Sequence, residues 1–120
     1  MSLLLAMLSV TATCTPTPAL ANSGPQRVRD YIAAINRRDE AAIGRFVKTG
    51  AVYSNPEVAG VPLAEVMTQL LGATQVDQFE VIEATLMNGT VFLRTRTPRG
   101  AEAAAIVHLD GGCVSRFEQG

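Results

Sequence analysis

The chain places its helix-forming residues before its strand-forming residues. Over residues 25–72, apolar residues recur at helical spacing, with one short apolar run among them. Over residues 76–118, short apolar runs are separated by turn-forming residues. This order predicts an α+β domain in which three helices and a short strand precede a four-strand meander. We expect the helices to pack on a curved, mainly antiparallel sheet and to leave a cavity between the two layers.

The helical half contains three candidate helices. In the first and third, apolar residues follow the i, i+3, i+4, i+7 spacing that places side chains on one helix face. They are Val28, Tyr31, Ile32 and Ile35 in the first helix, and Leu63, Val66, Met67 and Leu70 in the third. The second helix is expected to begin at Asp39 and the third at Pro62. A short strand is predicted over residues 51–53, and Asn55 and Pro56 end it.

A hairpin signal sets the register of the meander. Asn88 and Gly89 lie between apolar runs and favour a two-residue turn, which pairs Glu83 with Arg94. If residues 98–100 form a three-residue turn, alternation then sorts the side chains onto two faces. The first face, expected to pack on the helices, carries Ile82, Ala84, Leu86, Val91, Leu93, Thr95, Ala101, Ala103, Ala105, Val107 and Leu109. The second carries Val81, Glu83, Thr85, Phe92, Arg94, Arg96, Glu102, Ala104, Ile106 and His108.

The second face mixes apolar and charged side chains. Such a face is too charged for a core, and it fits either a homodimer interface with cross-strand ion pairs or a solvated back of the sheet. His108, the one histidine of the chain, falls on this face and so away from the expected cavity.

The register of the last strand depends on the turn near Asp110. A tight turn at Asp110 and Gly111, the preferred use of an Asp-Gly pair, sets Val107 opposite Val114. The side chains that then point inward are Val114, Arg116 and Glu118. A turn one residue longer exchanges the two faces and would bury the ring of Phe117. The inward set is then Cys113, Ser115 and Phe117. We favour the tight turn.

The first 21 residues have features of a secretory signal peptide. Residues 3–8 are an apolar block too short to span a bilayer, and residues 19–21 match the small-x-small pattern before a cleavage site. The domain would then be residues 22–120, secreted or periplasmic, with no stable membrane insertion after processing. Cleavage after Ala21 removes Cys14 and leaves Cys113 without an intrachain partner. No Lys or Arg precedes the apolar block, so a disordered N-terminal tail is the alternative.

Composition argues against several classes of function. The formal net charge is −1 and no run of Lys or Arg occurs, so nucleic acid is not an expected partner. One histidine and scattered carboxylates do not supply a metal site. A glycine-rich phosphate loop is also missing from the sequence, and we therefore expect no cofactor.

The order of the elements and several short stretches resemble the nuclear transport factor 2-like superfamily and, within it, the SnoaL-like domains. The stretches are residues 28–39, the strand end at residues 52–56, Gly60, and the hairpin at residues 109–116. The resemblance covers about residues 26–118 and implies a cone-shaped α+β fold with a cavity at its open end, commonly in a homodimer. Enzymes and non-catalytic binding proteins share this fold, so the resemblance does not decide function.

The resemblance also indicates what a reactive site would need. Enzymes of this kind use a pocket carboxylate as general acid or base, with a neighbouring donor to stabilise developing charge. Asn55 stands where many members have Asp before the proline, and an amide cannot take the proton. With the tight turn, the candidate catalytic residues are Glu118 as base, Arg116 as an anchor for an anionic or carbonyl oxygen, and Tyr53 as a donor. The expected ligand-contacting residues are Tyr53, Asn55, Thr95, Ala103, Ala105, Val107 and Val114.

Three functions fit these features. The favoured one is an exported domain that binds a small hydrophobic or carbonyl-containing ligand in an apolar cavity. The second is an acid/base enzyme of the isomerase, cyclase or hydrolase type. The third is a dimerisation or interaction module whose core is filled. The presence of a cavity, and of a carboxylate that opens into it, distinguishes the three.

Overall fold

The computed structural model describes residues 9–20, 22–73 and 78–120. The helices are α1 (Gly24–Asn36), α2 (Glu40–Gly44) and α3 (Leu63–Gly72), and a short 3-10 helix, η1 (Pro18–Leu20), precedes them. The strands are β1 (Val47–Ser54), β2 (Val61–Pro62), β3 (Glu80–Met87), β4 (Thr90–Arg96), β5 (Glu102–Asp110) and β6 (Cys113–Gln119). None of the helices in these ranges is long and apolar enough to cross a membrane.

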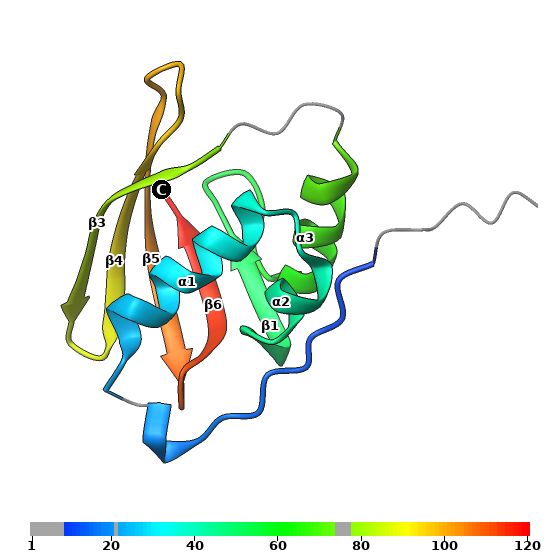
Figure 1. Ribbon diagram of the computed structural model, residues 1–120, viewed down its shortest axis with the longest axis vertical. Helices are drawn as coiled ribbons and strands as arrows, with labels where there is room; N and C mark the ends of the chain where they lie inside the picture. The colour runs from blue at the N-terminus through cyan, green and yellow to red at the C-terminus, as the bar shows by residue number, and fades with distance from the viewer. Residues whose placement is uncertain (1–8, 21, 74–77) are drawn as a thin grey trace, which may run out of the picture.

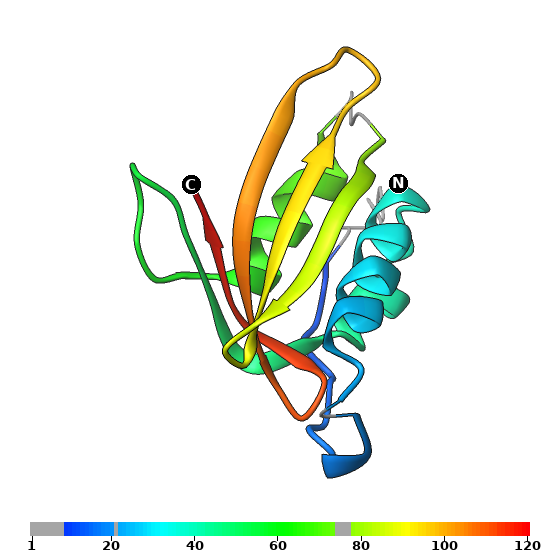
Figure 2. The same ribbon diagram turned by 90° about the vertical axis from the view of Figure 1, so that its left-hand side faces the viewer.

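The strands of the described residues form one six-stranded sheet in the order β2-β1-β6-β5-β4-β3. Strands β1 and β6 are parallel, and every other neighbouring pair is antiparallel. Figure 1 shows α1 lying across one face of the sheet, and Figure 2 shows how the long strands curve beside the helices. The predicted α+β architecture is confirmed. The short strand, expected over residues 51–53, is longer and begins at Val47.

The register predicted from Asn88 and Gly89 is also confirmed. Glu83 pairs with Arg94, Ala84 with Leu93 and Met87 with Thr90. The next turn has three residues as expected, because the Thr97 amide donates a 2.9 Å hydrogen bond to the carbonyl of Ala101. Alternation across β4 and β5 therefore places Ala103 and Ala105 toward the helices, where Ala103 pairs with Thr95 and Ala105 with Leu93.

One residue of β3 was assigned to the wrong face. The register shifts between Val81 and Glu83, so Val81 pairs with Thr95 and packs against the core. A β-bulge adds a residue to one strand and reverses the alternation beyond it. Val81 therefore lies on the helix side, although the sequence pattern placed it on the outer face.

The last hairpin follows neither predicted register along its whole length. Asp110 pairs with Cys113, so the tight turn consists of Gly111 and Gly112, which both have positive φ. Leu109 then pairs with Val114, but after a register shift Val107 pairs with Phe117. The extra residue reverses the alternation, as in β3. As a result, Val114 and Phe117 both point toward the helices, and the prediction that Arg116 and Glu118 point inward is wrong.

The N-terminal strap, residues 9–20, packs against the domain. Val10 is only 5% exposed, and its amide donates a 2.9 Å hydrogen bond to the Thr68 hydroxyl. Further along, the amide of Cys14 donates to the carbonyl of Val47 over 3.1 Å. Cys14 forms a disulfide with Cys113, with 5.8 Å between the Cα atoms. The expectation that Cys113 is unpaired, which assumed removal of Cys14, differs from this structure. The apolar block at residues 3–8 and Ala21 lie outside the described residues.

Glycines let the strap approach the domain closely. A Cβ on Gly112 would overlap the Cβ of Leu20, and a Cβ on Gly111 would lie 2.6 Å from the amide nitrogen of Thr17. A Cβ on Gly44 would overlap the carbonyl oxygen of Thr11. Any other residue at these positions would displace the strap backbone or its side chains. The strap therefore depends on three glycines as well as on the disulfide.

The outer face of the sheet carries cross-strand ion pairs, as predicted. Arg94 lies between two carboxylates, 3.3 Å from Glu83 and 3.2 Å from Glu102. The hydrogen bonds that the Arg94 guanidinium donates to Glu102 and to Glu83 raise its pKa. Each pair is partly solvated, and such pairs contribute little to stability. These ion pairs are compatible with a solvated face or with a homodimer interface, so the homodimer stays a prediction.

Candidate functional site

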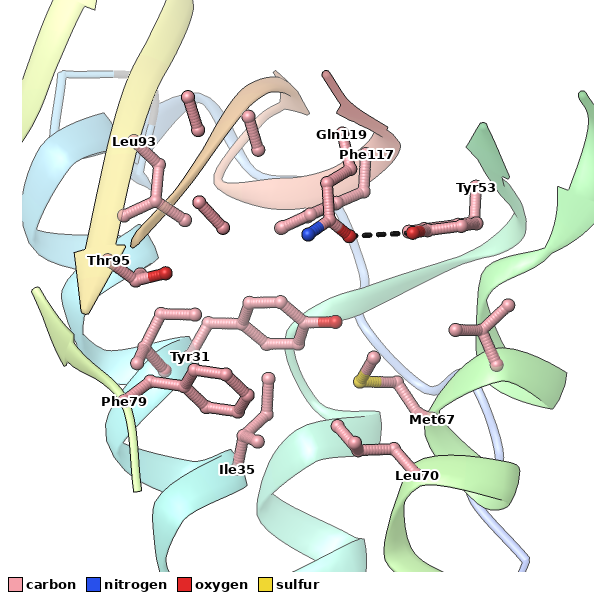
Figure 3. Close-up of a pocket in the computed structure, with 15 residues that line it drawn as sticks. Tyr31, Ile35, Tyr53, Met67, Leu70, Phe79, Leu93, Thr95, Phe117 and Gln119 are labelled. Carbon is pink, nitrogen blue, oxygen red and sulfur yellow. Dashed lines mark hydrogen bonds between the residues drawn. The ribbon is translucent and has the colours of Figure 1, made fainter. Parts of the chain in front are cut away.

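A pocket lies between the helical layer and the inner face of the sheet (Figure 3). Its volume is about 180 Å³. Helices α1 and α3 form one side, and strands β1, β4, β5 and β6 form the other. The lining residues are Tyr31, Ile32, Ile35, Tyr53, Val66, Met67, Leu70, Phe79, Leu93, Thr95, Ala103, Ala104, Ala105, Phe117 and Gln119. The pocket lies where the sequence predicts a cavity, and its use for a ligand stays a prediction.

The wall of the pocket is apolar and uncharged. Its polar side chains are two tyrosines, Tyr31 and Tyr53, together with Thr95 and Gln119. Among the residues that the structure describes, the lining set contains no Asp, Glu, Lys, Arg or His. A charged ligand group would therefore be buried there without a countercharge, which is strongly unfavourable.

Tyr31 reaches into the pocket from α1. It belongs to the apolar stripe of that helix and is 0% exposed, and its ring lies 6.0 Å from that of Phe46 and 6.5 Å from that of Phe117, between centroids. Among the described residues, its buried hydroxyl has no hydrogen-bond partner. Burial raises the pKa of Tyr31 well above the ordinary value for a tyrosine, so the hydroxyl keeps its proton and can donate it.

Tyr53 has a different environment. Its hydroxyl donates a 2.6 Å hydrogen bond to Oε1 of Gln119 and accepts a longer one, 3.4 Å, from Nδ2 of Asn55. Its ring stacks on Phe117, with centroids 6.1 Å apart and an interplanar angle of 17°. Strands β1 and β6 are parallel neighbours, and Tyr53 pairs directly with Phe117 in their register. The sheet itself therefore positions this part of the wall.

Phe79 completes the wall near the end of α1. The Asn36 side chain holds it through two hydrogen bonds of 2.8 Å, one to the Phe79 carbonyl and one from the Phe79 amide. An asparagine amide matches both backbone groups at once. The last residue of α1 therefore fixes the segment just before β3 against the pocket.

Four of the predicted ligand-contacting residues line the pocket: Tyr53, Thr95, Ala103 and Ala105. The other three do not. Val107 and Val114 are 0% and 1% exposed and belong to the packed core. Asn55 is not among the lining residues. Its Oδ1 accepts hydrogen bonds of 2.8 Å from the amides of Glu57 and Val58 and so stabilises the turn after β1.

Glu118 and Arg116 lie on the outer face of the sheet. Oε2 of Glu118 is 3.0 Å from Nε2 of His108, and Oε1 is 2.9 Å from Nε of Arg116. The hydrogen bond with His108 lowers the pKa of the Glu118 carboxyl, and the charge of Arg116 lowers it further. A general base in an apolar pocket needs the opposite shift. The predicted cluster of Glu118, Arg116 and Tyr53 is therefore divided between two faces, and Tyr53 is the member in the pocket.

Solved structures with this architecture come from several bacteria. One is a SnoaL-like protein of unknown function from Burkholderia thailandensis, with a TM-score of 0.69 and 19% identity over 84% of this chain and 96% of that chain. Another is an NTF2-like protein from Burkholderia xenovorans, with a TM-score of 0.65 and 14% identity over 84% of each chain. A third, from Cytophaga hutchinsonii, is also NTF2-like, with a TM-score of 0.62 and 13% identity over 90% and 92% of the two chains.

The chain has the nuclear transport factor 2-like fold. No family model and no curated protein matches the chain. At these identities the likeness establishes the fold and leaves function to be argued from the site. In this NTF2-like chain, the pocket between helices and sheet is the site to consider.

The sequence analysis missed several residues of the NTF2-like pocket. Tyr31 was assigned to the buried stripe of the first helix without regard to its hydroxyl, yet a phenol on a fully apolar stripe is a signal that a partner is needed. Phe117 was expected to point inward only with the longer turn, and Gln119 was not considered. Both line the pocket because of the bulge in β6, for which the sequence carries no clear signal. Among the described residues, no three His, Cys, Asp or Glu side chains are grouped as a metal site would require.

Proposed function

We propose that the protein binds a small apolar molecule in the pocket between α1, α3 and the sheet. The observation that carries this proposal is the uncharged lining around a space of about 180 Å³. Apolar surface is favourably removed from water when a ligand covers it. Pockets of this kind, apolar with a few polar groups, are typical of small-molecule sites.

The alanines of β5 support binding over a filled-core interaction module. Ala103 and Ala105 face the helices and line the pocket, and larger side chains at either position would occupy the space. An unfilled space next to a core lowers stability. Its retention beside two small residues therefore favours a role for the space itself.

The position of the carboxylates supports binding without acid/base catalysis. Within the described part of the chain, no Asp or Glu lines the pocket, and the predicted base, Glu118, pairs with His108 on the outer face. Proton transfer requires a group within hydrogen-bond reach of the reacting atom. We therefore favour a binding protein over an isomerase, cyclase or hydrolase that uses a pocket carboxylate.

A thermal-shift experiment with single-ring compounds tests the proposal. Ethylbenzene, α-methylstyrene and acetophenone are suitable, since a cavity of about 150 Å³ accommodates benzene. A ligand at 100 times its Kd should raise the Tm by roughly 5–10 °C. Ala103→Leu, which fills the pocket, should abolish the shift, whereas Ala101→Leu, at an exposed position outside the pocket, should keep it.

Two results would contradict this function. One is the absence of a shift with every compound in the wild-type protein. The other is an equal shift in wild type and Ala103→Leu, which would place binding elsewhere. The first result would favour the interaction module.

We also propose that the protein works in an oxidising compartment, secreted or periplasmic. The apolar block at residues 3–8 and the Cys14–Cys113 disulfide both support export. The packing of the strap argues for a mature chain that keeps Cys14 rather than one that starts at Asn22. Intact-mass analysis of the exported protein, with and without thiol alkylation, tests this. A chain that starts at Asn22 with a free Cys113 would overturn it.

A further inference from the structure

The Tyr31 hydroxyl is the fully buried polar group of the pocket that lacks a hydrogen-bond partner among the described residues. Buried polar groups without partners are rare in folded proteins, and each requires an explanation. The ring of Tyr31 packs near the rings of Phe46 and Phe117, which limits its freedom to turn the hydroxyl toward water. Figure 3 shows the ring reaching across the pocket toward the region between Tyr53 and Met67.

The hydroxyl of the other tyrosine in the pocket does not play the same part. The Tyr53 hydroxyl already donates to Gln119 over 2.6 Å and accepts from Asn55. Tyr31 therefore offers a proton that the pocket itself does not accept. A ligand that supplies an acceptor at this point would satisfy the hydroxyl and remove the penalty of its burial.

We propose that the pocket selects neutral, single-ring-sized molecules that carry one hydrogen-bond acceptor oxygen, such as a ketone or ester carbonyl, and that the Tyr31 hydroxyl donates to that oxygen. This inference rests on the proposed function and names its ligand class. A carbonyl adds an acceptor without adding a donor of its own that would need a second partner. Carboxylic acids are disfavoured, because the described lining residues include no Lys, Arg or His to pair with the anion.

The volume of the pocket limits the size of the proposed ligand. The pocket measures about 180 Å³, slightly more than the roughly 150 Å³ that holds a benzene molecule. Acetophenone is a suitable probe, since it joins one ring to one carbonyl. α-Methylstyrene has the same shape with a methylene group in place of the carbonyl oxygen, and benzoate has a similar size with a negative charge.

The experiment measures the Kd of acetophenone and α-methylstyrene for the full chain, in wild type and in Tyr31→Phe. Differences in hydration between the two probes cancel when their Kd ratio is compared between the two proteins. One hydrogen bond within a site corresponds to a change of about fivefold to tenfold in that ratio. We expect Tyr31→Phe to weaken acetophenone by that factor and to bind α-methylstyrene at least as tightly as wild type does.

Tyr53→Phe is the matched comparison. It removes a hydroxyl from the same wall, but one that already has an acceptor in Gln119. It should affect both probes by a similar factor and leave their ratio within twofold of the wild-type ratio. The infrared carbonyl stretch of bound acetophenone gives an independent readout. It should lie at lower frequency in wild type than in Tyr31→Phe.

The outcomes separate this inference from the proposed function. If both probes bind and Tyr31→Phe leaves their ratio unchanged, the inference fails and the proposed function stands. The same holds if benzoate binds more tightly than acetophenone. If neither neutral probe binds to wild type, the proposed function fails and the inference fails with it.

Discussion

The Tyr53 hydroxyl donates a 2.6 Å hydrogen bond to Oε1 of Gln119, which ties β1 to the end of β6 beside the pocket. Tyr31 lies in the wall of the same pocket, but its hydroxyl has no such partner among the described residues. The two tyrosines of the chain therefore differ in one respect that can be measured. One hydroxyl stabilises the unliganded fold, and the other does not.

Removal of each hydroxyl should have opposite consequences for stability. Tyr53→Phe loses a hydrogen bond and should lower the free energy of unfolding by about 1 kcal/mol. Tyr31→Phe removes a buried hydroxyl that has no partner, so it should leave the free energy of unfolding unchanged or raise it by up to about 1 kcal/mol. Urea unfolding of both variants beside wild type provides the comparison. An equal loss in the two variants would mean that Tyr31 has a partner in solution, such as an ordered water.

Tyr31 should also make the fold sensitive to alkaline pH. Its pKa is raised by burial, whereas in the unfolded chain a tyrosine ionises near pH 10. Below about pH 9 both states keep the proton, and stability does not depend on this group. Above pH 10 the unfolded state loses the proton first, so the free energy of unfolding should fall by up to about 1.4 kcal/mol per pH unit.

The control for this pH dependence is Tyr31→Phe. Other groups also titrate in this range, so the relevant quantity is the difference between wild type and the variant at pH 9 and at pH 11. That difference should shift in favour of the variant by about 1.4 kcal/mol. A constant difference would show that Tyr31 ionises freely in the folded protein.

Much of the fold was predictable because its signals are local. The stripe around Tyr31 in α1 and the turn at Asn88 and Gly89 each lie within a few residues of the structure that they specify. Alternation from that turn correctly placed Thr95, Ala103 and Ala105 on the pocket side. The alternation of residues along a strand was therefore sufficient to place side chains on the correct face wherever the strand has no bulge.

The errors arise where the strands are irregular or where contacts join distant parts of the chain. A bulge in β3 turns Val81 inward, and a bulge in β6 turns Phe117 inward and Glu118 outward. No short motif announces either bulge. The partner of Cys113 is 99 residues away in sequence, in a segment whose signal-like composition suggested that it would be removed. A signal-like composition does not indicate whether the segment also packs against the folded domain.

The disulfide should contribute strongly to stability, since it closes a long loop. Cys14 and Cys113 are 99 residues apart, and linking them restricts the unfolded chain. The double variant Cys14→Ala, Cys113→Ala should lower the free energy of unfolding by about 2–4 kcal/mol. Alanine avoids placing a hydroxyl at the fully buried Cys113 position. Reducing agent should destabilise wild type by a similar amount and leave the double variant unaffected; equal stability of wild type with and without reductant would argue against the bond.

The packing of the strap can be tested by replacing a glycine. The replacement should change the free energy of unfolding in the direction opposite to that expected from helix propensity. Gly44 ends α2, where alanine is ordinarily the better helix former by up to about 1 kcal/mol. Its Cβ, however, would overlap the carbonyl oxygen of Thr11 in the strap. We therefore expect Gly44→Ala to lower the free energy of unfolding by about 1–3 kcal/mol, as overpacking does.

Gly72 provides the matched control for this last prediction. It ends α3 in the same way, but a Cβ there would meet no atom of the described residues within 4 Å. Gly72→Ala should therefore leave stability unchanged or raise it by up to about 1 kcal/mol. Urea unfolding of both variants measures the contrast, and exposure of the strap to limited proteolysis should increase in Gly44→Ala alone. If both variants are stabilised alike, the strap does not lie against α2, because only a docked strap brings a backbone oxygen to the Gly44 position.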